Sequence, residues 1–178
     1  MVSGPSGAGK GTLIAAALKR RPDIVLTVSA TTRPARAGER DGVDYNFITI
    51  SDFLALRDRG AFLESAKVYG NYYGTLRAQV DEALALGRDV IVEVDIQGAE
   101  SIKRSMPEAV LVFVEPPSFE DLASRLRGRG TEQAEDLGRR IEAAYEEVKV
   151  KGTYDHIVVN DDLDRAVEDF LRILEGKR

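Results

Sequence analysis

Apolar and polar positions along the chain form alternating blocks that predict strands and helices in turn. Continuous apolar runs, typical of strands buried on both faces of a sheet, occur at residues 24–29, 89–95, 110–114 and 157–159. Between and after them, apolar residues recur at helical spacing and predict helices at residues 13–20, 96–106, 119–127, 132–149 and 163–174. Strands that alternate with helices predict an α/β fold with a parallel sheet, flanked by helices and joined by right-handed crossovers.

Two stretches of the sequence break this alternation of strands and helices, and we interpret them as insertions into the core. Residues 30–75 contain a long polar loop and short strands, and a glycine-rich break followed by a charged helix indicates a second, helical insertion. In the first of them we expect Ser51 and Thr75 to cap the helices that follow. Ahead of the helix predicted at 119–127, Ser118 and Asp121 have the spacing of a capping box. The predicted single domain has a core of residues 1–29, 76–121 and 142–178, a small α+β insertion at 30–75 and a lid at 122–141.

Near the start of the chain, two glycines bracket four residues and a lysine follows the second glycine. This spacing is that of a phosphate-binding loop, which here comprises Gly4, Pro5, Ser6, Gly7, Ala8, Gly9, Lys10, Gly11 and Thr12. Glycines let the backbone wind so that its N–H groups converge on a polyphosphate, and the following helix adds its positive end. A strand before the loop and a helix after it favour a nucleotide site over a simple glycine-rich turn.

The position after Lys10 departs from the common loop, in which a serine or threonine hydroxyl contacts Mg²⁺. Gly11 occupies this position and Thr12 follows it. Two alternatives stay open. Either Thr12 substitutes for the missing hydroxyl, or the metal is held through water and phosphate oxygens.

Composition narrows the class of protein. The 178 residues are 43% hydrophobic and 31% charged, as is typical of a soluble single domain. A net charge of −5 does not favour binding to a nucleic acid polymer. No apolar run approaches the roughly 20 residues of a membrane span. The lack of cysteine and of a signal peptide ahead of the loop favours a reducing, cytoplasmic compartment.

Arginine and tyrosine side chains in the first insertion are candidates for binding an anion. Arg33 and Arg36 lie three apart, and their guanidinium groups can converge on one phosphate, although a solvated basic loop is an equally open interpretation. Tyr45 and Tyr73 lie near glycines, where a phenol can donate to a phosphate or pack in a core.

Carboxylates and further arginines suggest the remaining chemistry. Glu93 and Asp95 are expected to share a face at the carboxyl end of a buried strand, where ligands bind in α/β sheets. There they can hold Mg²⁺ waters, ribose or base donors, or form a structural ion pair. The second insertion carries an arginine cluster that predicts a flap over a transferring phosphoryl group, or in part a solvated helix face: Arg125, Arg127, Arg129, Arg139 and Arg140.

Together these motifs closely resemble guanylate kinase along nearly the whole chain. The most specific segment is Thr31-Thr32-Arg33-Pro34-Ala35-Arg36-Ala37-Gly38-Glu39-Arg40-Asp41-Gly42-Val43-Asp44-Tyr45-Asn46-Phe47. Segments 71–74, 95–98, 116–118, 128–131 and 159–162 are similar to the same family. The resemblance implies a P-loop NTPase-like kinase fold, transfer of the γ-phosphoryl group from ATP to GMP, and Mg²⁺ bound with ATP.

The resemblance also implies a role for each candidate residue. ATP would lie on the phosphate loop with Asn160 near its adenine, and Thr12 and Asp95 would contact the metal directly or through water. The transferring phosphoryl would be stabilised by Lys10, Arg125, Arg129 and Arg140. The GMP phosphate would be held by Arg33, Arg36, Tyr45 and Tyr73, and guanine would be recognised by Ser29, Glu64, Thr75 and Asp95, with Glu93 nearby.

The chemistry of guanine agrees with the role implied for Glu64. Guanine presents two donors, N1–H and the 2-amino group, and one carboxylate can accept both. Hydroxyls at Ser29 and Thr75 can donate to its O6 atom. Adenine lacks the 2-amino group and presents a donor at position 6, so the same residues would not recognise it.

Two other functions stay open at this point. The Gly-Lys-Gly-Thr loop slightly favours an AMP-preferring nucleotide kinase, which the segment 33–47 opposes. A catalytically inactive guanylate kinase-like module that binds peptides would tend to lose the phosphate loop or the arginines of the GMP site, and this chain keeps both.

The family usually carries more residues ahead of the loop, so we expect a short first strand within residues 1–3.

Overall fold

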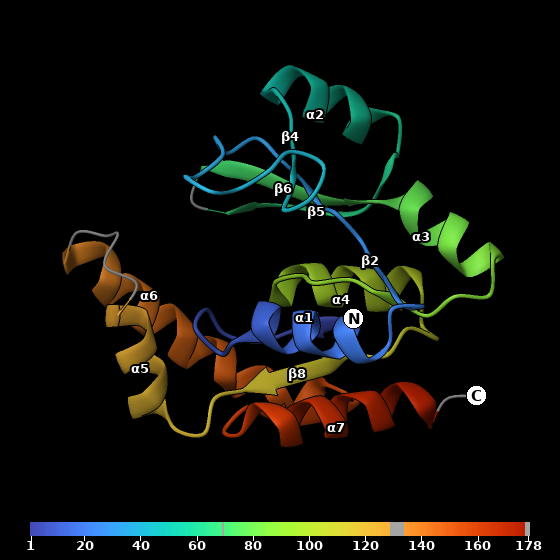
Figure 1. Ribbon diagram of the computed structural model, residues 1–178. Helices are drawn as coiled ribbons and strands as arrows, with labels where there is room; N and C mark the ends of the chain where they lie inside the picture. Colours follow the sequence, from blue (N-terminus) through green and yellow to red (C-terminus); the bar gives the residue numbers. More distant parts are fainter. Residues whose placement is uncertain (69, 129–133, 177–178) are drawn as a thin grey trace.

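The computed structural model describes residues 1–68, 70–128 and 134–176, and of residues 134–137, 139 and 140 it describes the backbone alone. A parallel sheet with helices on both faces forms the centre, which confirms the predicted α/β class (Figure 1). The strand groups β2-β7 and β1-β8-β9 are linked where Val2 N donates to Val92 O at 2.8 Å and Val94 N donates to Val2 O at 3.1 Å. The strands are β1 (Val2–Ser3), β2 (Val25–Leu26), β7 (Val90–Ile91), β8 (Val112–Glu115) and β9 (His156–Val159).

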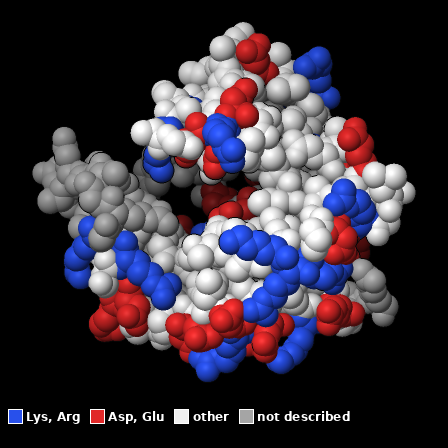
Figure 2. All heavy atoms as spheres, viewed as in Figure 1, with Lys and Arg blue, Asp and Glu red and all other residues white. Residues whose placement is uncertain are grey.

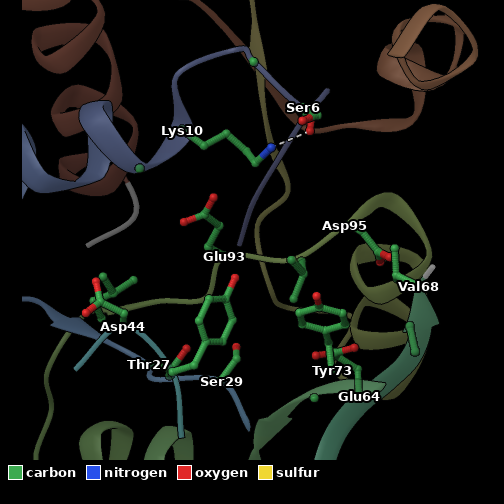
Figure 3. A pocket seen from close by; sticks show the side chains of 18 of the residues that line it. Ser6, Lys10, Thr27, Ser29, Asp44, Glu64, Val68, Tyr73, Glu93 and Asp95 are labelled. Atoms are coloured by element: carbon green, nitrogen blue, oxygen red, sulfur yellow. Dashed lines mark hydrogen bonds between the residues drawn. The ribbon is translucent and has the colours of Figure 1, made fainter. Parts of the chain in front are cut away.

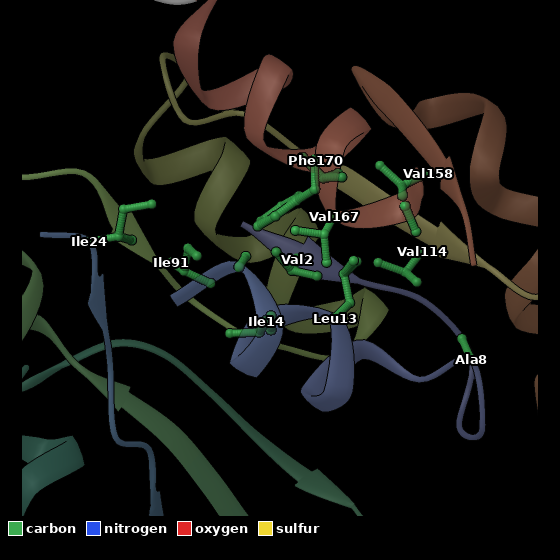
Figure 4. Close-up of a cluster of buried hydrophobic side chains, with 13 residues drawn as sticks. Val2, Ala8, Leu13, Ile14, Ile24, Ile91, Val114, Val158, Val167 and Phe170 are labelled. Atoms are coloured by element: carbon green, nitrogen blue, oxygen red, sulfur yellow. The ribbon is translucent and has the colours of Figure 1, made fainter. Parts of the chain in front are cut away.

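Each face of this sheet has its own apolar core. On one face the strands pack with α1 (Lys10–Arg20) and α7 (Leu163–Glu175), and Leu13 and Phe170 are fully buried there (Figure 4). On the opposite face the alternate side chains of the strands pack with α4 (Ile96–Ser105). Because both faces are covered, the strand residues are apolar at successive positions.

The chain between β2 and α3 (Arg77–Ala85) forms a second sheet with the order β4-β3-β6-β5 (Figure 1). In it β3 pairs parallel with β4 and antiparallel with β6. The ring of Phe53, from α2 (Ile50–Asp58), stacks on that of Phe62 with centroids 4.4 Å apart and forms a separate small core. The strands are β3 (Ala30–Thr31), β4 (Asn46–Phe47), β5 (Phe62–Val68) and β6 (Asn71–Leu76).

Two helices follow β8 and pack on each other around a small buried cluster. They are α5 (Phe119–Gly128) and α6 (Ala134–Lys149), and the short 3₁₀ helix η1 (Val150–Thr153) leads from α6 to β9. The predicted capping box at the start of α5 is present, since Asp121 N donates to Ser118 Oγ at 3.0 Å. Within the described ranges no helix is long and apolar enough to cross a membrane.

The predicted caps of two helices are wrong. Thr49, not Ser51, caps α2, because Asp52 N donates to Thr49 Oγ1 at 3.1 Å. Thr75 does not cap α3, since Leu76 occupies the N-cap position and Thr75 is still part of β6. In both cases the helix begins at a different residue, so the predicted hydroxyl does not stand at the cap.

The apolar run at residues 24–29 does not form one strand as predicted. β2 ends at Leu26 and pairs with the core sheet, whereas β3 begins at Ala30 and pairs in the insertion. Residues 27–29 therefore carry the chain from one sheet to the other. A continuous apolar run cannot reveal such a change of sheet, because it does not show which strand the backbone pairs with.

Candidate active site

A cleft of about 890 Å³ lies between the core sheet and the insertion. Figure 2 shows it as a hollow in the surface with carboxylates exposed inside, and Figure 3 shows the side chains that face it. Most of the residues predicted from the sequence line this cleft: Gly4, Ser6, Gly7, Gly9, Lys10, Gly11, Thr12, Ser29, Arg36, Tyr45, Glu64, Tyr73, Glu93 and Asp95. The fold thus brings the phosphate loop and most of the candidate acceptor residues to one place, whereas Arg33, Thr75 and Asn160 are not among the lining residues.

The phosphate loop closes through three glycines whose backbone lies in the left-handed region. Their φ angles are +141° at Gly4, +91° at Gly7 and +87° at Gly9. A Cβ added at Gly4 would lie 2.3 Å from the carbonyl oxygen of Val114 in β8, so only glycine fits there. Because α1 begins directly at Lys10, its free N-terminal N–H groups add to an anion-binding concavity.

Two side chains fix the shape of this loop. Lys10 Nζ donates to the carbonyl oxygens of Gly4 at 2.6 Å and Pro5 at 3.2 Å. Asn160 is buried at the end of β9, and its Nδ2 donates to the carbonyl oxygen of Ala8 at 2.8 Å. Sequence reasoning missed this contact, because no local pattern signals a hydrogen bond between residues 152 positions apart.

The arginines predicted to stabilise the transferring phosphoryl group are described in part. Arg125 lies in α5, and its Nη2 donates to the carbonyl oxygen of Asn160 at 3.2 Å, which places it beside the phosphate loop. Arg129 lies outside the described residues, and Arg140 is described only as part of the α6 backbone. The roles of all three stay predictions.

Arg33 is held in place by a residue that sequence reasoning did not single out. Its Nη1 and Nη2 donate to the two carboxylate oxygens of Glu39 at 2.9 and 2.8 Å. These hydrogen bonds, with one from the Arg36 backbone N–H, lower the pKa of Glu39 to about 2. The Arg33 guanidinium also lies 5.4 Å from the ring centroid of Tyr45, which meets Tyr73 edge to face at 6.0 Å. The only local signal for Glu39 was an acidic residue among arginines.

Glu64 is a buried carboxylate at the insertion side of the cleft, with only 8% of its surface exposed. Its Oε1 accepts hydrogen bonds from Thr75 N at 3.0 Å and Thr75 Oγ1 at 2.9 Å. Burial raises the pKa of Glu64, and the nearby charge of Asp95 adds to the shift. The hydroxyl of Thr75, expected to reach the guanine carbonyl, is thus donated to Glu64 in this structure.

Glu93 and Asp95 both line the cleft, but they do not share a strand face as predicted. β7 ends at Ile91, and Asp95 is the N-cap of α4, where its Oδ1 accepts from Gly98 N at 2.7 Å. In Figure 3, Glu93 lies toward Lys10, whereas Asp95 lies on the side of β5. The two carboxylates are therefore placed for different contacts.

The sequence of the whole chain matches one known family. The family model described as guanylate kinase matches residues 1–177. The chain belongs to the guanylate kinase family. It is 46% identical to the guanylate kinase of Aromatoleum aromaticum and 48% identical to that of Carboxydothermus hydrogenoformans. In both comparisons the alignment covers 100% of this chain and 87% of the relative.

Solved structures agree with the guanylate kinase assignment. A crystal structure of guanylate kinase from Anaplasma phagocytophilum is 32% identical, has a TM-score of 0.81, and is matched over 99% of this chain and 83% of that chain. A shikimate kinase from Bacteroides thetaiotaomicron is 18% identical with a TM-score of 0.52, covering 98% of this chain and 96% of that one. The second likeness shows the fold alone, a P-loop kinase-like arrangement.

Kinases generally use a divalent metal with ATP. In this guanylate kinase-family chain, the described residues contain no group of three or more His, Cys, Asp or Glu side chains that could hold a metal ion. Thr12 is exposed near the start of α1, and one oxygen of Asp95 is already engaged as a helix cap.

Proposed function

We propose that this chain holds ATP on the phosphate loop and GMP against the insertion, and transfers the γ-phosphoryl group from ATP to GMP. Membership of the guanylate kinase family over the whole length supports this activity. The observation that carries it is a phosphate loop facing the buried carboxylate of Glu64 across one cleft. Neither the AMP-preferring kinase nor the inactive binding module is favoured by any of the comparisons.

Recognition of GMP rests on a carboxylate whose position is already fixed. Thr75 holds one oxygen of Glu64 through two hydrogen bonds, so the carboxylate does not have to be ordered when the base binds. Guanine satisfies it with N1–H and the 2-amino group, whereas adenine would leave a buried acceptor unpaired. Ser29 and Asp95 complete the base site, and Arg33, Arg36, Tyr45 and Tyr73 hold the phosphate.

Transfer needs no covalent intermediate and no strong general base. A phosphate oxygen of GMP, already anionic, attacks the γ-phosphorus in line while the bond to the β–γ bridging oxygen breaks and its electron pair leaves with ADP. Lys10 and the arginines Arg125, Arg129 and Arg140 stabilise charge on the moving group. The loop and the insertion supply the alignment, which lowers the entropic part of the barrier.

The oxygen donors at the cleft suit a hard cation. The hydroxyl of Thr12 and the carboxylate of Glu93, which lies toward Lys10, would hold Mg²⁺, in part through water, and the ion would neutralise charge on the ATP phosphates. Asp95, which the resemblance also implied for the metal, lies on the side of β5 and belongs with the base site. The choice between direct contact and contact through water stays part of this proposal.

The test is turnover with matched acceptors. Purified protein with Mg²⁺ and ATP should convert GMP to GDP, with ADP formed in equal amount and measured in a coupled assay. AMP should be a much poorer acceptor, because it lacks both donors that Glu64 accepts. Turnover with AMP that equals turnover with GMP would contradict the assignment of GMP as the acceptor. No turnover with either nucleotide would contradict the proposed kinase activity.

A further inference from the structure

Val28 lies where the chain leaves the core sheet for the insertion. On one side of it, Thr27 N still donates to the carbonyl oxygen of Ile91 in β7 at 3.1 Å. On the other side, the carbonyl oxygen of Ser29 already accepts from Asn46 N in β4 at 2.9 Å. Val28 belongs to neither sheet, so its own N–H and C=O groups need partners from elsewhere.

The side-chain amide of Gln79 supplies both partners. Its Oε1 accepts from Val28 N at 2.8 Å, and its Nε2 donates to the carbonyl oxygen of Val28 at 3.0 Å. A primary amide carries an acceptor and donors side by side, so it pairs with a peptide as a neighbouring strand would. Gln79 stands in the first turns of α3, directly after β6 returns from the insertion. The contact therefore joins the outgoing and the returning crossings of the chain.

Fixing Val28 fixes the residues on both sides of it. The side chains of Thr27 and Ser29 both line the cleft, as residues two apart on an extended chain share a face. Asn46 Nδ2 adds a second donor to the carbonyl oxygen of Val28 at 2.8 Å, so this carbonyl is held from α3 and from β4. The crossing is thus a joint that hydrogen bonds from the core helix α3 and from β4 of the insertion hold in place.

We infer that Gln79 is a positioning residue for the acceptor site, whose amide fixes the Val28 crossing and so holds Ser29 and the insertion where the acceptor nucleotide binds. The role in acceptor binding rests on the proposed function, whereas the hydrogen bonds of Gln79 are seen in the structure itself. The phosphate loop is held separately, through Lys10 and Asn160. Loss of the Gln79 contact therefore weakens binding of the acceptor and spares that of ATP.

The variant Gln79→Met removes both hydrogen bonds and keeps the length and helix propensity of the side chain. Two net hydrogen bonds correspond to a rise in the KM for GMP of about five- to 150-fold. The KM for ATP, and kcat at saturating GMP, should stay close to wild type. The matched control Glu82→Met places the same residue on the exposed side of α3 and should leave all three constants unchanged.

Amide hydrogen exchange, followed by NMR, tests the contact without reference to activity. In the wild-type protein the Val28 amide should be protected although it lies outside the strands, and in Gln79→Met it should exchange at least about tenfold faster. The Thr27 amide, bonded to β7, should keep its protection in both proteins.

Several results would overturn the inference. They are an unprotected Val28 amide in the wild type, an unchanged KM for GMP in Gln79→Met, or an equal rise in the KM for ATP. If Gln79→Met does not fold, exchange in the wild type still decides whether the joint exists. If the wild type fails to phosphorylate GMP, the proposed function fails, whereas the exchange data continue to judge the Gln79 contact.

Discussion

The two sides of the cleft are built by different means. On the side proposed to bind ATP, the candidate binding groups are backbone N–H groups of residues 4–12, and glycine dihedral angles and the start of α1 set their direction. On the side proposed to bind GMP, the candidate binding groups are side chains from separate segments, such as Arg33 in the loop after β3 and Glu64 in β5. Each of these is held by a second residue, Glu39 for Arg33 and Thr75 for Glu64.

This difference predicts how each side responds to substitution. Where backbone groups bind the ligand, a contiguous motif is sufficient to form the site, and substitution of only a few side chains there should weaken function strongly. Where side chains bind, specificity depends on pairs of residues that the fold brings together, and the holding residues share the effect with the residues that touch the ligand.

The largest effect is expected for Lys10→Met, which removes the side-chain charge from the ATP side. Lys10 lies on the loop, where we propose that its positive charge stabilises the moving phosphoryl group, so kcat should fall by about 10³ or more. Binding of GMP, measured by calorimetry, should be unchanged. The control Lys19→Met, on the exposed end of α1, should keep wild-type kcat. A kcat within a few-fold of wild type would contradict the role of Lys10.

The next effect concerns Glu64→Gln, which breaks the centre of the GMP side. The variant amide can accept from Thr75 with its oxygen, but it then presents N–H donors to the two donors of guanine. We expect a loss of roughly 2–5 kcal/mol in kcat/KM for GMP, as for a broken buried charged hydrogen bond. The KM for ATP should stay the same. A wild-type KM for GMP would reject Glu64 as the residue that recognises the base.

The same contrast explains what the sequence could predict. The phosphate loop and the capping box at Ser118 are contiguous patterns, and the structure contains both. The contact of Asn160 with Ala8 was not predicted, because it depends on how the ends of the core meet. The run at residues 24–29 was assigned to one strand, since an apolar run does not show which strand its backbone pairs with. Non-local pairing leaves no periodic trace in a single sequence.

A smaller effect is expected for Asn160→Ala, which tests how far the ATP side depends on a distant side chain. Loss of the hydrogen bond leaves the buried carbonyl oxygen of Ala8 without this donor, and the KM for the phosphoryl donor should rise roughly tenfold. If Asn160 acts by holding the loop, the KM values for ATP and GTP as donors rise by the same factor. If it recognises adenine, as the family resemblance implied, only the KM for ATP rises.

The smallest effect is expected for Glu39→Gln, which removes a holding residue from the GMP side. Without its charged partner, Arg33 is less well fixed, and the KM for GMP should rise about two- to fivefold, within the range of a partly exposed ion pair. The pKa of Glu39 in the folded protein, about 2, lies below the ordinary value of 4.5. The pair therefore stabilises the fold fully above the ordinary pKa, and this stabilisation is lost as the pH falls toward 2. The difference in the free energy of unfolding between wild type and Glu39→Gln should thus shrink between about pH 6 and about pH 3. A difference that stays constant over this interval would mean that Glu39 acts through its shape and not through its charge.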